Sequence, residues 1–351
     1  MVVRVTVPGP RGAQSAQPRS GTAAPRLAHI AAQAKVSEAT VSRVLNGKAG
    51  VAEATRKRVL AALDVLGYER PTRLRQRSAG LVGLVIPELT NPIFPAFAQV
   101  VEQVLAGRGY TPILCTQIPG GSVEDELVEQ LVERGVDGII FLSGLHADLS
   151  ADPARYAALS ARGVPYVLIN GYNPAISAPF VSPDDHAAVR MAVTHLTELG
   201  HRKVGLAVGP VRFVPSHRKR EGFVEATGAP GLVQHTFFSV EGGQVAAGAL
   251  LDEGCTGIVC GSDMMALGVI RAARDRGLRV PEDISVVGYD DSPLIPFTDP
   301  PLTTVRQPVQ AMATAAVGAL LEEIGGNPVQ HTEYVFQPEL VVRGSTGHLR
   351  G

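Results

Sequence analysis

The chain has 351 residues, of which 45% are hydrophobic and 19% are charged, and its formal net charge is −1 at pH 7. This composition is typical of a globular protein, and the length accommodates two or three domains with apolar cores. No run of eighteen apolar residues occurs, which excludes a membrane-spanning helix, and we expect a soluble protein.

Residues 1–25 precede the first predicted helix. They are rich in Gly, Pro, Ser, Ala and Gln, and they lack the apolar segment of a signal peptide. We therefore expect a disordered tail, or an overlong start of the reading frame.

Residues 27–46 contain two short helical patterns, separated by Lys35 and Val36. The first pattern has apolar residues at helical spacing, namely Leu27, Ile30, Ala31 and Ala34. In the second, which begins at Ser37, the residues predicted to face inward are Val41, Val44 and Leu45. Those predicted to face outward are Glu38, Ala39, Ser42 and Arg43. Two such helices joined by a tight turn form a helix-turn-helix unit, whose second helix fits a DNA major groove.

A third helical pattern covers residues 51–66 and ends before Gly67, so we assign residues 26–68 to a three-helix DNA-binding domain. Residues 69–80 form a basic connector, or hinge, with the apolar Leu74 at its centre. Residues 26–77 contain eleven basic and four acidic side chains, a net charge of +7, so the remainder of the chain is acidic. A basic module on an acidic body indicates a polyanionic partner bound through one end.

From residue 81 onward, short apolar runs alternate with longer amphipathic stretches. Strands are predicted at 81–87, 111–117, 138–144, 165–171, 203–210, 231–240, 257–262 and 284–291, with helices between them and a further helix at 308–324. This alternation predicts an α/β fold with two successive doubly wound parallel sheets. Ligands of such sheets bind beyond the carboxyl ends of the strands, in a cleft between the two units.

The sequence offers little for catalysis or cofactor binding. No glycine-rich phosphate loop follows a first strand, so we expect no nucleotide cofactor. The three cysteines lack metal-ligand spacing, and we expect core or free reduced thiols at Cys115, Cys255 and Cys260. No Ser-His-Asp, paired-carboxylate or metal-binding pattern is evident, and we expect neither an enzyme nor a metal site.

Seven segments carry a resemblance that extends from residue 27 to residue 345. They are VSEATVSRVLNG (36–47), TRKRVLAALDVLGY (55–68), LVGLVIPELTNPIF (81–94), LGHRKVG (199–205), GSDMMALG (261–268), ISVVGYDD (284–291) and PPLTTVRQP (300–308). In these segments, and in their order, the chain resembles the lactose-repressor/purine-repressor family of bacterial transcription regulators. The resemblance implies a cytoplasmic homodimer that binds a pseudo-palindromic operator, since two symmetry-related recognition helices read two half-sites.

The resemblance also implies a two-lobed effector domain like that of periplasmic sugar-binding proteins. On this basis residues 81–348 form an effector-binding and dimerisation domain. Lobe 1 is expected at about 81–180 and 303–330, and lobe 2 at about 181–302 and 331–348.

By position in the motifs, the base-reading residues implied by the resemblance are Glu38, Ala39 and Arg43. Arg43 can pair bidentately with guanine and Glu38 can accept from cytosine, whereas the methyl group of Ala39 can touch only thymine. Phosphate contacts are implied at Ser37, Thr40, Ser42, Asn46 and Thr55. Ser37 has a second interpretation as only the N-cap of its helix.

The hinge has two interpretations. In the family a hinge helix inserts a leucine into the central minor groove, and Leu74 is the candidate for that wedge. The connector is about one helical turn shorter than usual in the family and more basic. The alternative is therefore that its arginines simply hold phosphates.

Two further departures from the family concern the helical domain. Lys35 stands where the family usually has a glycine in the turn, and a left-handed backbone there costs about 1 kcal/mol without glycine. Ala52 replaces the usual polar cap of the third helix, which costs about 1 kcal/mol.

The same positional reasoning implies an effector site built from Phe94, Asn170, Arg218, Lys219, Asp263 and Asp290. Asp263 and Asp290 end strands and can accept sugar hydroxyls, but Asp263 can instead cap the following helix. Of the adjacent Arg218 and Lys219, only one need point into the cleft.

The leading hypothesis is a sequence-specific DNA-binding repressor whose affinity for a palindromic operator is set by a small effector, a carbohydrate. The alternative is a solute-binding protein of the same fold without a role in gene regulation. The presence of residues 27–68 and the absence of an export signal argue against that alternative.

Overall fold

The computed structural model describes residues 27–45, 51–66, 80–117, 123–327 and 329–349. The chain divides into two compact units, Met1–Arg77 and Ser78–Gly351. Within the described residues, no helix is both long enough and apolar enough to cross a membrane.

The first unit consists of three helices, α1 (Leu27–Ala34), α2 (Glu38–Leu45) and α3 (Glu53–Val65). Helical spacing of the apolar side chains gives each helix one inward face. These faces together bury one small core: Ile30, Ala31, Ala34, Val41, Val44, Val59, Ala62 and Leu63. The three helices predicted from periodicity are therefore present, and they pack as a helix-turn-helix with a supporting third helix.

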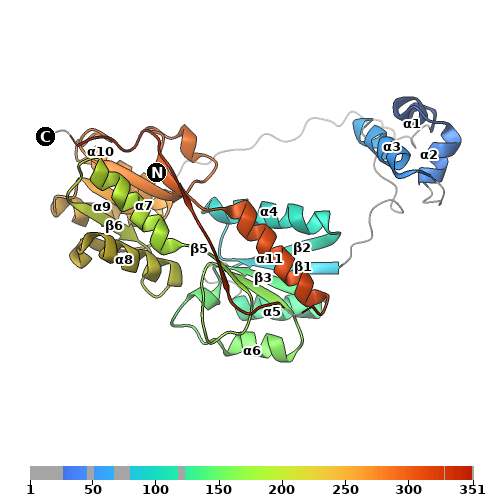
Figure 1. Ribbon diagram of the computed structural model, residues 1–351, viewed down its shortest axis with the longest axis horizontal. Helices are drawn as coiled ribbons and strands as arrows, with labels where there is room; N and C mark the ends of the chain where they lie inside the picture. Colours follow the sequence, from blue (N-terminus) through green and yellow to red (C-terminus); the bar gives the residue numbers. More distant parts are fainter. Residues whose placement is uncertain (1–26, 46–50, 67–79, 118–122, 328, 350–351) are drawn as a thin grey trace, which may run out of the picture. The chain divides into compact units, whose positions relative to one another are not determined.

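The second unit contains two six-stranded sheets, each the centre of one lobe (Figure 1). The lobe 1 sheet has the order β11-β5-β4-β3-β1-β2, and every pair is parallel. Its strands are β1 (Gly80–Ile86), β2 (Tyr110–Thr116), β3 (Gly138–Leu142), β4 (Tyr166–Ile169), β5 (Phe180–Pro183) and β11 (Glu333–Phe336).

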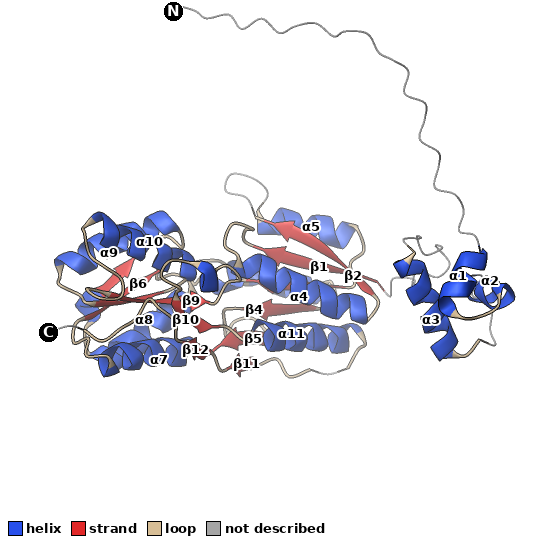
Figure 2. Ribbon diagram, turned by 90° about the horizontal axis from the view of Figure 1, so that it is seen from above, coloured by secondary structure: helices blue, strands red, loops and turns tan. Residues whose placement is uncertain are grey.

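Helices cover both faces of the lobe 1 sheet (Figure 2). One face packs on α4 (Ile93–Gly107) and α11 (Val309–Ile324), and the other on α5 (Glu124–Glu133) and α6 (Ala154–Ala161). Successive side chains of a strand point to opposite faces, so Leu84 and Ile86 lie in the first core and Val85 in the second. Burial on both faces explains why these strands read as continuous apolar runs.

Lobe 2 repeats this architecture with the order β12-β10-β9-β8-β6-β7. Its strands are β6 (Val204–Val208), β7 (Val233–His235), β8 (Gly257–Cys260), β9 (Ser285–Asp290), β10 (Thr303–Arg306) and β12 (Glu339–Val341), of which β12 alone is antiparallel among the described pairs. The flanking helices are α7 (Asp185–Glu198), α8 (Val214–Thr227), α9 (Val240–Asp252) and α10 (Asp263–Asp275). The predicted α/β fold class is confirmed.

The expected lobe boundaries are wrong in two places. β10, which was expected in lobe 1, pairs in parallel with β9 of lobe 2, and the chain crosses between lobes only after it, at residues 307–308. β11, which was expected in lobe 2, pairs in parallel with β5 of lobe 1, and the last crossover follows it at residues 337–338. An apolar run alone does not specify which sheet edge it joins, because both edges offer unpaired backbone groups.

Two short 3-10 helices follow strands of the two lobes. η1 (Leu145–Ala147) follows β3 in lobe 1, and η3 (Ile295–Phe297) follows β9 in lobe 2. Cys255 and Cys260 lie in a lobe 2 core cluster, so their prediction as core thiols is confirmed, whereas Cys115 is half-buried.

Candidate nucleic-acid interface and effector cleft

Helix α2 presents one polar face to solvent. Its apolar residues Val41 and Val44 are fully buried against α1 and α3. Four of the residues predicted to contact bases or phosphates are exposed: Ser37, Glu38, Ala39 and Arg43. Thr40 and Ser42 are half-buried on the flanks of the helix. The outward face predicted from periodicity therefore exists, and it carries the three predicted base readers.

Hydrogen bonds at the start of α2 support the capping interpretation of Ser37. The Thr40 backbone N–H donates to Ser37 Oγ at 3.2 Å, and the hydroxyl oxygens of Ser37 and Thr40 are 2.9 Å apart. This cap satisfies one of the otherwise unpaired N–H groups of the helix. Because Ser37 is exposed, capping leaves its hydroxyl accessible. In α3, Thr55 is half-buried and accepts a hydrogen bond from Arg58 at 3.4 Å.

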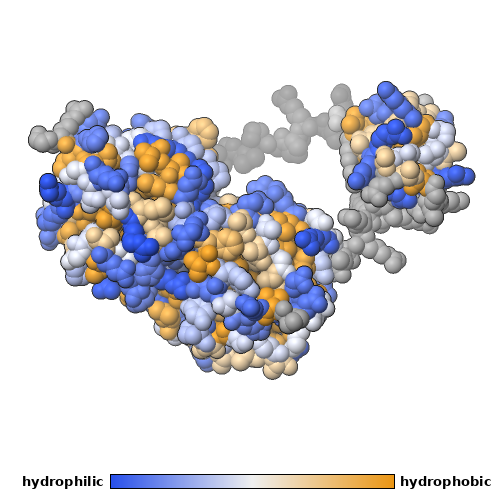
Figure 3. Space-filling model, viewed as in Figure 1, coloured by the Kyte–Doolittle hydropathy of each residue, from blue (hydrophilic) through white to orange (hydrophobic). Residues whose placement is uncertain are grey.

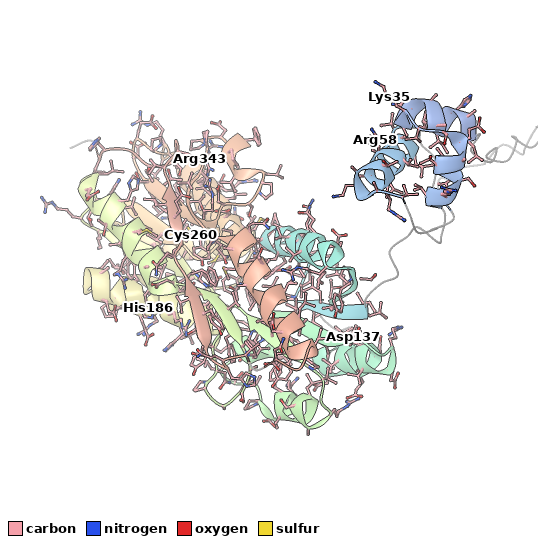
Figure 4. The ribbon with its side chains drawn as sticks, turned by 45° about the vertical axis from the view of Figure 1, so that its right-hand side comes forward. Lys35, Arg58, Asp137, His186, Cys260 and Arg343 are labelled. Carbon is pink, nitrogen blue, oxygen red and sulfur yellow. The ribbon has the colours of Figure 1, made fainter. Side chains whose placement is uncertain are left out.

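The turn between α1 and α2 has the conformation expected from the family's glycine. Lys35 has a φ of 54°, in the left-handed region, and its side chain lies at the surface of the helical unit (Figure 4). The Val36 N–H donates to the carbonyl of Ala31 at 3.0 Å, which closes the end of α1. Ala52 lies at the N-cap position of α3, since its carbonyl accepts from the N–H groups of Thr55 and Arg56. Asn46 and Leu74 lie outside the described residues.

A cleft lies between the two lobes of the second unit. It contains about 790 Å³ of empty space, part of it open to solvent. Its aromatic lining consists of Phe94, Phe213, Phe238 and Tyr289. Its polar lining consists of Glu88, Asn91, Ser143, Asn170, Asp185, Lys219, Ser262, Asp290 and Gln307. Four of the six predicted effector residues, Phe94, Asn170, Lys219 and Asp290, are therefore brought together.

The cation of the cleft is neutralised within its own wall. Lys219 is almost fully buried, and its Nζ forms an ion pair with Asp185 Oδ1. The same Nζ lies 3.8 Å from the centroid of the Tyr289 ring, whose hydroxyl donates to Asp185 Oδ1 at 3.3 Å. A buried charge is stable only when it is paired in this way. Lys219 thus contributes no uncompensated positive charge to a ligand.

Two buried amide oxygens of the cleft have no hydrogen-bond partner among the described residues: Asn170 Oδ1 and Gln307 Oε1. The other end of each amide is occupied, since Asn170 Nδ2 donates to Ser143 Oγ at 3.2 Å and Gln307 Nε2 to Asp290 Oδ1 at 2.7 Å. Leaving a buried polar atom unpaired costs free energy, and such atoms at a cleft point to a ligand or water that pairs with them.

Asp290 ends β9 in a strained conformation, with a φ of 117°. Burial and the neighbouring Asp263 carboxylate raise the pKa of Asp290 well above its ordinary value, because both disfavour the charged form. Backbone strain and shifted pKa values are common at binding sites.

Two predicted effector residues do not line the cleft. Arg218 forms a two-pronged ion pair with Glu333 of β11, at 2.7 and 2.9 Å, and so connects the lobes instead. Asp263 is buried behind β9, where it accepts from the Thr304 hydroxyl at 2.6 Å and the Ser292 N–H at 2.8 Å. Both the Asp263 carboxylate and the Arg218 guanidinium are therefore held by protein partners. Ser262, and not Asp263, is the N-cap of α10, since its hydroxyl oxygen accepts from the Met265 N–H.

Sequence reasoning missed several cleft residues, including Asp185, Phe213, Phe238 and Gln307. Asp185 and Gln307 flank two of the crossovers between lobes, and that position was the available signal. Phe213 and Phe238 follow β6 and β7, at the carboxyl ends where ligands of parallel sheets bind.

Two family models match the chain. The model described as bacterial regulatory proteins, lacI family, matches residues 26–71, and the model described as periplasmic binding protein-like domain matches residues 193–346. These ranges contain the helical unit and most of lobe 2.

Whole proteins are also similar. A protein of Streptomyces limosus, described as an uncharacterized HTH-type transcriptional regulator in the aml 5' region, is 73% identical over 339 residues, which cover 94% of this chain and 97% of that protein. The solved complex of the transcriptional regulator CelR with cellobiose has a TM-score of 0.68 and 33% identity, and covers 92% of this chain and 100% of that one. The lac repressor dimer bound to operator and the anti-inducer ONPF has a TM-score of 0.67 and 28% identity, and covers 91% and 98% of the two chains.

These similarities extend over the DNA-binding unit and both lobes, and they confirm the resemblance seen in the sequence motifs. Members of the family regulate transcription and are not enzymes. The chain belongs to the lacI family of bacterial regulatory proteins and is a DNA-binding transcriptional regulator of the helix-turn-helix type.

Proposed function

We propose that this regulator is a repressor that binds a palindromic operator as a homodimer in the bacterial cytoplasm, and that a neutral carbohydrate in the cleft changes its operator affinity. A ligand that binds the closed and open lobes with different affinity shifts the balance between them, and this shift is coupled to DNA binding.

The choice of ligand rests on two amide oxygens of the cleft that have no hydrogen-bond partner among the described residues, Asn170 Oδ1 and Gln307 Oε1. Four aromatic rings line the same cleft. Sugar hydroxyls are donors that can pair with these oxygens, and the apolar C–H faces of sugar rings pack on aromatic side chains. The solved relative CelR holds cellobiose, a sugar of this chemical class.

The charges of the cleft favour a neutral sugar over a phosphorylated one. The ionisable side chains that line it are Glu88, Asp185, Asp290 and Lys219, and Lys219 is already paired with Asp185. Arginines and lysines that are free of other partners commonly bind phosphate groups. Among the described lining residues, a phosphate group would meet carboxyl groups and no unpaired cation.

For the operator contacts, we propose that Glu38, Ala39 and Arg43 read base edges in the major groove. Ser37, Thr40, Ser42, Asn46 and Thr55 are proposed to contact phosphates, and Leu74 the central minor groove. The exposure of the α2 face supports the first of these assignments.

The homodimer is supported by apolar surface on lobe 2. Leu294 is 70% exposed and Phe297 is 84% exposed, both in the segment around η3. Figure 3 shows apolar surface gathered on part of this lobe. Large exposed apolar side chains that lie close together mark interaction sites, and a second copy of the chain is the proposed occupant. The lac repressor relative was solved as a dimer.

Fluorescence polarisation with labelled upstream operator fragments tests the proposal. We expect sequence-specific binding that cellobiose or another neutral sugar changes and that glucose 6-phosphate does not. A parallel thermal-shift screen detects ligands independently of DNA, because a ligand at 100 times its Kd adds about 2.7 kcal/mol to stability. Absence of specific DNA binding contradicts the repressor assignment, and a response to the phosphorylated sugar alone contradicts the ligand class.

A further inference from the structure

The η1 segment of lobe 1 connects the wall of the cleft to the opposite lobe. Ala147, its last residue, lines the cleft. The next two residues reach lobe 2, where Asp148 Oδ2 pairs with Arg212 Nε at 3.0 Å and the Leu149 N–H donates to the Arg212 carbonyl at 2.8 Å. Asp148 and Phe213 also form an antiparallel bridge. Because Phe213 lines the cleft from lobe 2, this contact links both walls of the ligand site.

The Asp148 carboxylate is oriented for this contact by its own loop. Its Oδ1 accepts from the Ser150 N–H at 2.9 Å and the Ser150 hydroxyl at 2.6 Å, which leaves Oδ2 for Arg212. The position of the carboxylate therefore depends on how firmly η1 itself is held.

A buried carboxylate holds the start of η1. Glu124, the first residue of α5, is 1% exposed, and its Oε2 accepts from the Leu145 N–H at 2.8 Å and from Gln117 Nε2 at 3.0 Å. Its Oε1 accepts from the Tyr156 hydroxyl at 2.7 Å. Three donors are expected around a carboxylate removed from water, since burial without them is costly.

Tyr156 extends this support to the middle of η1. Its hydroxyl donates to Glu124 and accepts from the His146 N–H at 2.8 Å. The His146 ring is also anchored, with Nε2 3.0 Å from the carbonyl of Ile169 at the end of β4. Glu124, Tyr156 and β4 thus hold successive residues of η1.

Space around Glu124 is limited by the residue before η1. A Cβ on Gly144 would lie 2.5 Å from Glu124 Oε2, and the backbone of Gly144 is extended, with a φ of −80°. A side chain at this position would have to displace the Glu124 carboxylate, so glycine here leaves room for the carboxylate beside the η1 backbone.

We infer that Glu124 and Tyr156 are positioning residues: they hold η1 so that Asp148 and Leu149 engage Arg212, and they thereby favour the closed cleft. Neither residue lines the cleft, so the pair acts on the ligand site through η1. The inference concerns lobe closure and does not depend on the carbohydrate proposed above.

Hydrogen–deuterium exchange of the full-length chain, without ligand, tests this inference. In Tyr156→Phe we expect exchange of the lobe 2 peptide 209–217 to accelerate about 5-fold, because η1 loses the hydrogen bonds that link the Tyr156 hydroxyl to Glu124 and His146 and holds the contact less firmly. Strand β8 of lobe 2 is the internal reference and should not change. Tyr166→Phe is the matched control, because Tyr166 is buried in the same aromatic cluster. Its hydroxyl lies 3.1 Å from the Ser160 hydroxyl and not beside η1, so its loss should leave 209–217 unchanged.

A double-mutant cycle separates positioning from general loosening. Arg212→Ala removes the ion pair with Asp148 but keeps the backbone hydrogen bond from Leu149, so Tyr156→Phe should accelerate the exchange of 209–217 less in that background than in the wild type. Glu124→Gln preserves the shape of the side chain. If Tyr156→Phe does not fold, the exchange of 209–217 is measured in Glu124→Gln instead. The inference is overturned if 209–217 is unchanged in the folded variant, if β8 accelerates equally, or if the effects of the two substitutions are additive.

Discussion

Replacing Lys35 with glycine should stabilise the DNA-binding unit. The φ of 54° at Lys35 costs a residue with a Cβ about 1–2 kcal/mol. Glycine removes this cost, but its greater conformational entropy in the unfolded chain opposes folding by about 0.4–1 kcal/mol. The central values differ by about 0.8 kcal/mol, a net stabilisation of a unit whose described core contains eight buried apolar residues.

Native-state hydrogen exchange in the full-length protein measures this change. The amides of Val41 and Val44 report opening of the unit, since both residues are buried in its core. A stabilisation of this size slows their exchange about 2- to 5-fold in Lys35→Gly. Ala32→Gly is the control, because Ala32 is exposed within α1, where glycine should cost about 1 kcal/mol and accelerate exchange. Faster or unchanged exchange in Lys35→Gly would refute the assignment of strain to this turn.

Three further predictions follow from the site and the fold. Arg43→Ala should relax specificity at one base position by about 1–3 kcal/mol in competition binding, whereas an equal loss on every sequence means that Arg43 contacts phosphate. Phe297→Asp should shift the chain from dimer to monomer in light scattering, while Phe237→Asp, at another exposed aromatic of lobe 2, should not; an unchanged dimer argues for a different interface. Burial lowers the pKa of His146 from 6.5 to about 4, because it disfavours the charged ring. The buried neutral ring therefore contributes to stability above the unfolded pKa of 6.5, and this contribution is lost as the pH falls from 6.5 to about 4. In urea unfolding, the wild type should therefore lose about 2 kcal/mol more than His146→Gln between about pH 7.5 and about pH 5, and an equal loss in both excludes this role.

Local patterns in the sequence were sufficient for the helices of the DNA-binding unit and for the α/β class. The spacing of Ile30, Ala34, Val41 and Val44 specifies which face of each helix is inside, because periodicity is a local property. Alternating apolar runs and amphipathic stretches likewise predict a doubly wound sheet. The left-handed turn at Lys35 was also predictable, by resemblance to a family that has glycine there.

The effector cleft depended on tertiary structure. Arg218 and Lys219 are adjacent in sequence, yet Arg218 crosses to Glu333 of the other lobe and Lys219 turns to Asp185. One helical step separates their directions by about 100°, so their partners depend on which surfaces pack on either side of α8.

The same limit applies to the strands and to the buried carboxylates. β10 and β11 exchange places between the lobes relative to expectation, because sheet membership depends on which edge is free when the chain returns. Asp263 and Asp290 both look like strand-end ligands in the sequence, but only Asp290 reaches the cleft, while Thr304 and Ser292 saturate Asp263. The sequence by itself determined the helix-turn-helix and the sheet class, since their signals lie within a few residues. The grouping of the unpaired Asn170 and Gln307 at one cleft was decided only by the tertiary structure, because these two residues come from distant parts of the sequence.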